Sequence, residues 1–182
     1  LAFDKGEFEE LLVKSSFDFS DIQKNLAFLK GYKTEGNISS QDITEAIPKS
    51  LQDNIFDMTQ LLLRGQIQDV RELVHDLRLQ GEDEIKLIAV MLGQFRTYLQ
   101  VKLLSAQGKS EQQIVSSLSD YLSRKVNPFQ VRYAIRDSRH LSVAFLKTTI
   151  KTLVETDYQI KTGTLDKDYL LDLALLKIAS NS

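Results

Sequence analysis

The 182-residue sequence contains no cysteine, and it has only two prolines, eight glycines and two histidines. Without cysteine the chain forms no disulfide and offers no thiolate to a metal ion. The histidines, His75 and His140, lack a partner three or four residues away on the same helix, so no metal site is predicted. The formal net charge of −2 gives no overall attraction to nucleic acid.

Motifs for nucleotide binding and catalysis are also missing. The glycines are dispersed, and neither GxxxxGK[ST] nor GxGxxG occurs, so no nucleotide-binding loop is predicted. There is no GxSxG and no grouping of acids and bases that predicts a catalytic residue or a cofactor. No apolar run has the length and flanks of a membrane helix or a signal peptide, so we expect a cytoplasmic protein without a membrane partner.

What the sequence does contain is a recurring apolar spacing of three and four residues, which is typical of an all-α fold. The longest such stretch covers residues 84–107, and its predicted apolar face consists of Ile85, Ile88, Leu92, Phe95, Leu99 and Leu103. Further apolar residues widen this face until only a narrow polar strip remains. We therefore predict a central helix that other elements cover on most sides.

Two helical domains are predicted, with a boundary near Pro48. Residues 1–47 carry few apolar residues and predict a small domain of three short helices, about 3–14, 20–32 and 39–47. Asp18 or Ser20 is expected to cap the second helix, and Ser39 with Asp42 forms a capping-box pattern before the third. Residues 48–182 predict a helical bundle built around the central helix.

Positive charge is concentrated in residues 124–151, which contain seven basic residues and one acid. Residues 1–63, by contrast, contain six basic and eleven acidic residues. Arg132, Arg136 and Arg139 have helical spacing and are expected to share a face. This stripe is either a contact for phosphates or for an acidic partner, or a solvated face that pairs with acids of the same protein. We favour the second interpretation.

The end of a long predicted helix, about residues 141–162, carries a second candidate feature. Asp157 and Lys161 have the favourable i,i+4 order, and Lys161 lies near the negative end of the helix dipole. Gly163 is expected to take the left-handed conformation that often follows a helix. The simplest role of this motif is to stabilise the helix end by a few tenths of a kcal/mol, about 0.2–0.5.

Three segments, taken in order, resemble the C-terminal region of the bacterial DNA polymerase III delta subunit, a clamp-loader subunit. They are residues 54–58 (NIFDM) followed by 61–65 (LLLRG), residues 127–131 (NPFQV), and residues 157–163 (DYQIKTG) followed by 170–173 (LLDL). Residues 17–47 resemble the end of the lid domain that precedes this region. Asn127 stands where the family commonly has His, and Asp172 stands where it usually has Glu.

The resemblance implies a lid domain at 1–47 and a collar domain at 48–182 that packs with the collars of other clamp-loader subunits. In this family the delta subunit does not hydrolyse ATP, and an N-terminal ATPase-like domain binds the sliding clamp. We expect that domain to precede residue 1, so this chain is expected to be non-catalytic although its parent holoenzyme is a DNA-directed DNA polymerase. DNA is a further possible partner. The alternative function is a helical nucleic-acid-binding domain that uses residues 124–151.

Overall fold

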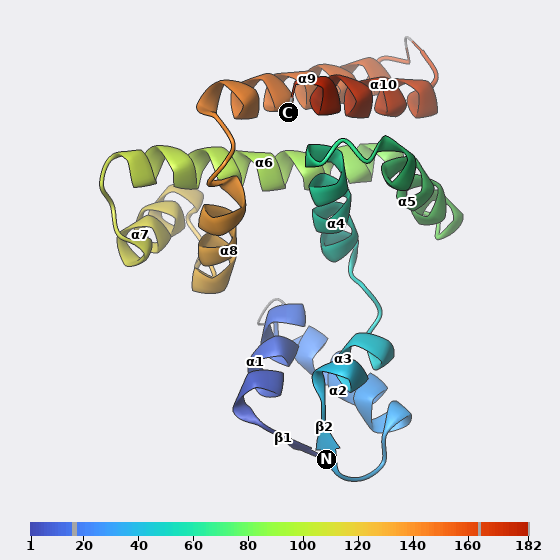
Figure 1. Cartoon of the computed structure of the whole chain (residues 1–182), viewed down its shortest axis with the longest axis vertical. Helices are drawn as coiled ribbons and strands as arrows, with labels where there is room; N and C mark the ends of the chain where they lie inside the picture. The colour runs from blue at the N-terminus through green and yellow to red at the C-terminus, as the bar shows by residue number, and fades with distance from the viewer. Residues whose placement is uncertain (16–17, 164, 182) are drawn as a thin grey trace. The chain divides into compact units, whose positions relative to one another are not determined.

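The computed structural model describes residues 1–15, 18–163 and 165–181 (Figure 1). In these ranges the chain forms ten α-helices and two strands of two residues each, which confirms the predicted all-α class. Its contacts divide it into two compact units, Leu1–Ser50 and Leu51–Ser182. The boundary predicted after residue 47 lies close to this division, and independent folding of each part stays a prediction. Residue 17, at the start of the lid resemblance, lies outside the described ranges.

The first unit contains three helices and one short parallel strand pair. Its elements are β1 (Ala2–Phe3), α1 (Lys5–Lys14), α2 (Phe19–Tyr32), β2 (Asn37–Ile38) and α3 (Ser40–Ala46). The first helix was predicted to begin at Phe3, and this was wrong, because the backbone of Phe3 pairs with Ile38 in the strand register. A small core closes the unit and comprises Leu11, Leu29, Ile38, Ile43 and Ile47.

Side chains cap two helices of this unit as the sequence predicted. Asp18 accepts a hydrogen bond from the Asp21 amide at the start of α2. Ser39 and Asp42 form a reciprocal capping box at the start of α3, which satisfies two backbone amides that the helix leaves without partners. Lys33 also reaches Asp42, with 2.7 Å between Nζ and Oδ2. Together the hydrogen bonds from Lys33 and Ser39 lower the pKa of Asp42 to about 2.

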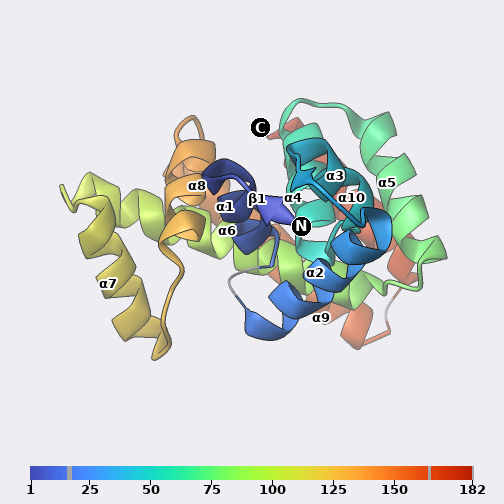
Figure 2. The same cartoon turned by 90° about the horizontal axis from the view of Figure 1, so that it is seen from below.

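The second unit is a helical bundle around one long central helix. Its elements are α4 (Leu51–Leu63), α5 (Ile67–Leu79), α6 (Glu84–Ala106), α7 (Glu111–Leu122), α8 (Pro128–Ser138), α9 (Val143–Lys161) and α10 (Lys167–Ser180). Helix α6 contacts α4, α7, α8, α9 and α10. In Figure 1, α9 and α10 form a layer along one side of α6. Figure 2 shows α7 and α8 near one end of α6, and α4 and α5 near the other.

The core of this unit confirms three of the six residues predicted to form the apolar face of α6, namely Ile88, Leu92 and Phe95, and Leu99 packs against it half-buried. Phe95 is fully buried, and its ring lies edge-on to Tyr98 and Phe145 at centroid distances of 5.9 and 6.5 Å. Leu103, however, is 41% exposed, so its predicted burial was wrong. Helix α9 begins part-way along α6 and leaves the last turns of α6 without this cover (Figure 1). Glu84, at the other end of α6, is unexpectedly buried.

Candidate partner interface

The predicted basic stripe lies on α8, which begins at Pro128 with Asn127 as its N-cap. The Asn127 side chain accepts a hydrogen bond from the Phe129 amide, and Pro128 occupies the first turn, where its missing amide is not needed. Arg132 and Arg136 follow on successive turns with exposed side chains, and Arg139 is the exposed residue that ends the helix. Helix α8 thus brings all three arginines to one element.

Arg132 is held by a carboxylate from another helix. Its Nε and Nη2 atoms donate to Oε1 of Glu111 on α7, at 3.2 and 3.0 Å. Its guanidinium also lies over the Phe129 ring, 5.4 Å from the centroid. The hydrogen bonds to Glu111 raise the pKa of Arg132 above its usual value, so the arginine remains charged. The orientation of Arg132 is therefore set within the chain.

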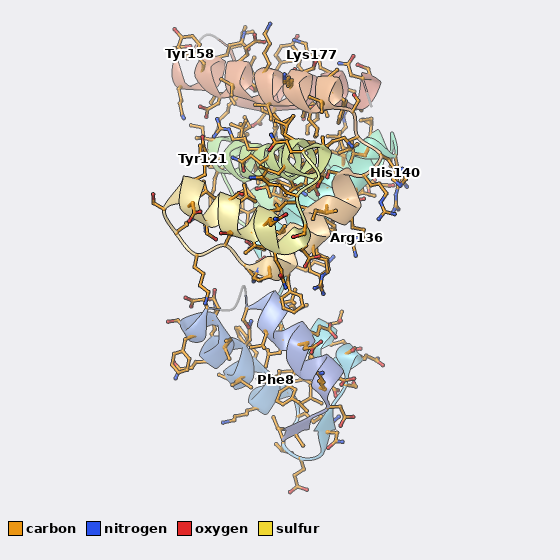
Figure 3. The ribbon with its side chains drawn as sticks, turned by 90° about the vertical axis from the view of Figure 1, so that its left-hand side faces the viewer. Phe8, Tyr121, Arg136, His140, Tyr158 and Lys177 are labelled. Atoms are coloured by element: carbon orange, nitrogen blue, oxygen red, sulfur yellow. The ribbon has the colours of Figure 1, made fainter. Side chains whose placement is uncertain are left out.

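Arg136 has a similar arrangement one turn later. Its Nε donates to Oδ1 of Asp137 at 2.7 Å, and its guanidinium lies 5.0 Å from the centroid of the Tyr133 ring. The second oxygen of Asp137, Oδ2, is buried and accepts no hydrogen bond among the described residues. Burial raises the pKa of the nearby Tyr98 hydroxyl to about 12, and the charge of Asp137 adds to this shift. Figure 3 shows Arg136 at the surface of the α8 side.

These contacts place an acidic group of the same protein against two of the three arginines. Arg139 contributes its backbone, because its carbonyl and that of Ser138 each accept a hydrogen bond from Lys102 Nζ at 3.1 Å. Lys102 thus pairs with carbonyl groups that the end of α8 leaves without partners in the helix. Its positive charge also interacts favourably with the negative end of the α8 dipole. Arg132 and Arg136 remain exposed, so a partner can still reach them although nearby carboxylates partly neutralise their charge.

The second candidate feature, at the end of α9, has the geometry that its spacing predicts. Lys161 Nζ lies 2.7 Å from Asp157 Oδ2. Gly163 has φ +66°, in the left-handed region, and its amide donates to the Ile160 carbonyl at 3.1 Å. A side chain at residue 163 would strain this conformation, which explains the glycine. The contacts that these residues make all lie within the helix end.

The α9–α10 layer also carries apolar side chains on its solvent side. On α10 and just before it, Leu165, Tyr169 and Leu176 are 57%, 56% and 40% exposed. Figure 3 shows Tyr158 of α9 and Lys177 of α10 on this outer layer. Single exposed apolar residues are normal, but Tyr169 and Leu176 lie seven residues apart on α10, and Leu165 comes just before that helix, which indicates a surface that a partner can cover.

A buried charge cluster joins α5, α6 and α10, and it was not predicted from the residue pattern. Glu84, with a side chain 4% exposed, pairs through Oε1 with Arg78 Nε at 2.8 Å and through Oε2 with Lys167 Nζ at 2.9 Å. Burial opposes the charge of Glu84, but the hydrogen bonds that it receives outweigh burial and lower its pKa. A glutamate in the first turn of a helix is normally exposed, so only the packing identifies it.

Neither a metal-binding cluster nor a membrane-spanning helix is found among the described residues. No group of three or more His, Asp or Glu side chains there is arranged to hold a metal ion. None of the helices in the same ranges combines the length and the apolar character that crossing a membrane requires.

This chain is similar to known proteins both in sequence and in structure. A family model described as the DNA polymerase III delta subunit, C-terminal domain, matches residues 52–178. The DNA polymerase III subunit delta of Bacillus subtilis (strain 168) is 35% identical over 160 residues, which are 88% of this chain and 44% of that protein. The solved structure of the Bacillus subtilis DNA clamp loader delta protein matches with a TM-score of 0.83 and 30% identity, over 98% of this chain and 51% of that one. The chain thus spans about half the length of these relatives.

Proposed function

This chain belongs to the family of C-terminal domains of the DNA polymerase III delta subunit, and we propose that it binds other clamp-loader subunits and performs no chemical step itself. In this proposal Leu51–Ser182 is the collar, which assembles with other collars, and Leu1–Ser50 is the lid. Binding of the sliding clamp is assigned to a domain that lies outside this chain. The work of the assembly, loading the clamp for DNA replication, takes place in the cytoplasm.

The observation that carries the proposal is the structural match to the clamp-loader delta protein, which extends over 98% of this chain at a TM-score of 0.83. A match of this extent includes both compact units and not only the residues of the family model. It supports a shared architecture, and with 30% identity it supports more than a common fold. The role in assembly is inferred from the name and class of that relative.

The exposed apolar face of α10, defined as Leu165, Tyr169 and Leu176, is the surface that we assign to a neighbouring collar. Stable subunit interfaces are apolar at the centre and polar at the rim. Asp172 and Lys177 lie beside these residues on the same helix and supply such a rim. The inner side of α10 is packed against α4, α5, α6 and α9, so the helix is firmly supported from within.

A pull-down tests this proposal. The immobilised chain is incubated with the remaining clamp-loader subunits in one arm and with the sliding clamp in the other, and binding to the loader subunits alone is expected. Replacement of Tyr169 and Leu176 by serine is expected to weaken that binding, whereas Tyr121→Ser is the matched control, since Tyr121 is 76% exposed at the end of α7. Firm clamp binding without loader binding would overturn the proposal.

Nucleic-acid binding through residues 124–151 is a second candidate function. The observation that favours it is the alternation of Arg132 and Arg136 with the rings of Phe129 and Tyr133, since arginines and aromatic rings are the side chains on which single strands stack. The carboxylates of Glu111 and Asp137 oppose it by partly neutralising the arginines. Binding of DNA that is tight and falls steeply with salt would favour this candidate over the first.

A further inference from the structure

Helix α10 carries apolar residues on every side, so apolar packing alone does not select one rotation about its axis. The side that is buried consists of Leu170, Leu171, Ala174, Leu175 and Ile178. A rotation of about 100°, the angle between consecutive helical residues, would present a neighbouring side instead. That side consists of Leu171, Asp172, Leu175, Leu176 and Ala179, and four of its five residues are apolar. This rotation would turn Asp172 inward and would bury Ala179 in place of Ile178, so burial of hydrocarbon favours the observed rotation, but the difference is confined to a few positions.

The charged cluster at the start of α10 does distinguish between them. Lys167 Nζ lies 2.9 Å from Oε2 of Glu84 and 3.1 Å from Oδ2 of Asp83. The next residue, Asp168, lies 3.4 Å through Oδ1 from Nη2 of Arg78, an ion-pair distance with no hydrogen bond between those atoms. Consecutive residues of α10 thus contact the end of α5 and the start of α6.

Rotation of α10 would break these contacts, and apolar packing would not compensate for their loss. It would take Lys167 away from Glu84 and Asp168 away from Arg78, while Glu84 and the Nη2 atom of Arg78 are buried. Glu84 would keep Arg78 but lose Lys167, and a buried charge with fewer partners is less favourable, whereas a displaced apolar side chain on this helix finds another apolar neighbour.

We propose that Glu84 is a positioning residue that selects the rotation of α10, by pairing with Arg78 of α5 and Lys167 of α10 together. Buried ion pairs contribute little net stability compared with apolar residues of the same size, but they discriminate against arrangements that leave them unpaired. The same selection decides that Tyr169 and Leu176 face outward. The consequence for partner binding rests on the proposed function, but the selection itself does not.

The test measures a distance across the second unit of the full chain. The natural sequence has no cysteine, so nitroxide labels attach only at cysteines introduced at His75 of α5 and Lys177 of α10, which are exposed and outside the cluster. We compare the distance distribution of the otherwise unchanged chain with that of Arg78→Met/Glu84→Met. The control is Asp157→Asn/Lys161→Met, because that ion pair lies within α9 and does not reach α10.

We expect a single population in the unchanged chain and in the control, and more than one population in Arg78→Met/Glu84→Met, with little change in its thermal midpoint. Glu84→Gln is expected to show an intermediate distribution, because an amide keeps hydrogen bonds but not the charge. A pair that only stabilises the bundle would give the opposite result, with a lowered midpoint and an unchanged distance. That result, or a double variant that no longer folds, overturns the proposal. Loss of loader binding in a chain with unchanged distances would count against the proposed function alone.

Discussion

Arg132 on α8 and Glu111 on α7 form a forked ion pair across 21 residues of sequence, with Nε and Nη2 both donating to Oε1. The pair joins two consecutive helices at the surface of the second unit. It also means that the most regular basic feature of the sequence faces an acid of its own chain. A partner that binds this surface must compete with Glu111 for Arg132, or else bind the pair as a unit.

Charge reversal at this pair separates its structural role from its role in binding. Arg132→Glu is expected to lower the thermal midpoint only slightly, because the lost ion pair is exposed and the repulsion between the new carboxylate and Glu111 is screened by solvent. Loader or DNA binding that uses the stripe is expected to weaken, as measured by pull-down and by salt-titrated DNA binding. Arg71→Glu, on the exposed side of α5, is the control. Equal binding by both variants would exclude the stripe as a contact.

The central helix supplies a direct test of the core. Phe95→Ala is expected to destabilise the second unit by about 3–5 kcal/mol, because it removes a fully buried ring and leaves a cavity. Leu103→Ala changes the same helix at a 41% exposed position, and a change of within about 0.5 kcal/mol is expected there. Thermal or denaturant melts measure both values. A surface-sized effect at Phe95 contradicts the packing described above.

The boundary between the two units predicts how fragments behave. Residues 49–182 are expected to fold alone, because their core is built around α6. Residues 1–47 are not, because the core formed by the described residues of this range holds only five buried apolar side chains. Limited proteolysis is expected to cut first near residues 47–53, and circular dichroism of the two fragments reports their folding. A chain that resists cutting there and unfolds in one transition would contradict this division.

Asp42 predicts a loss of stability in acid. Its pKa is lowered from 3.8 to about 2 in the folded protein, so the folded state binds the proton less readily than the unfolded state. The contribution of Asp42 is therefore fully present above its unfolded pKa and is lost as the pH falls through the folded pKa. Between about pH 5 and pH 2, amide exchange in α3 of the natural chain should approach that of Asp42→Asn. A difference between the two chains that stays constant over this range would refute the assignment.

Much of the local structure was predictable because the determinants are local. The capping box of Ser39 and Asp42, the cap at Asp18 and the left-handed Gly163 all depend on residues within a few positions of each other. The same holds for the helical spacing that predicted α6 and the all-α class. The family was predictable for another reason, since three ordered segments retain the family pattern across residues 52–178.

The errors arose where distant segments decide the outcome. Phe3 was assigned to a helix because its strand partner, Ile38, lies 35 residues away and leaves no local pattern. Leu103 was assigned to the core because periodicity identifies a helix face but does not say how far the covering helices extend. The arginines of α8 were predicted to share one helix, but the pairing of Arg132 with Glu111 depends on the packing of α7 against α8.

By itself, the sequence determined the all-α class, the caps at Asp18 and Ser39, the left-handed Gly163, much of the apolar side of α6 and the family, because each depends on short-range spacing or on retained motifs. Only the tertiary structure decided that Glu84 is buried, which acid faces Arg132, and which side of α10 turns inward. Charges at helix ends and apolar residues around a whole helix are compatible with several arrangements. The choice among them is made where α5, α6 and α10 meet, because a buried charge requires partners that lie far away in the chain.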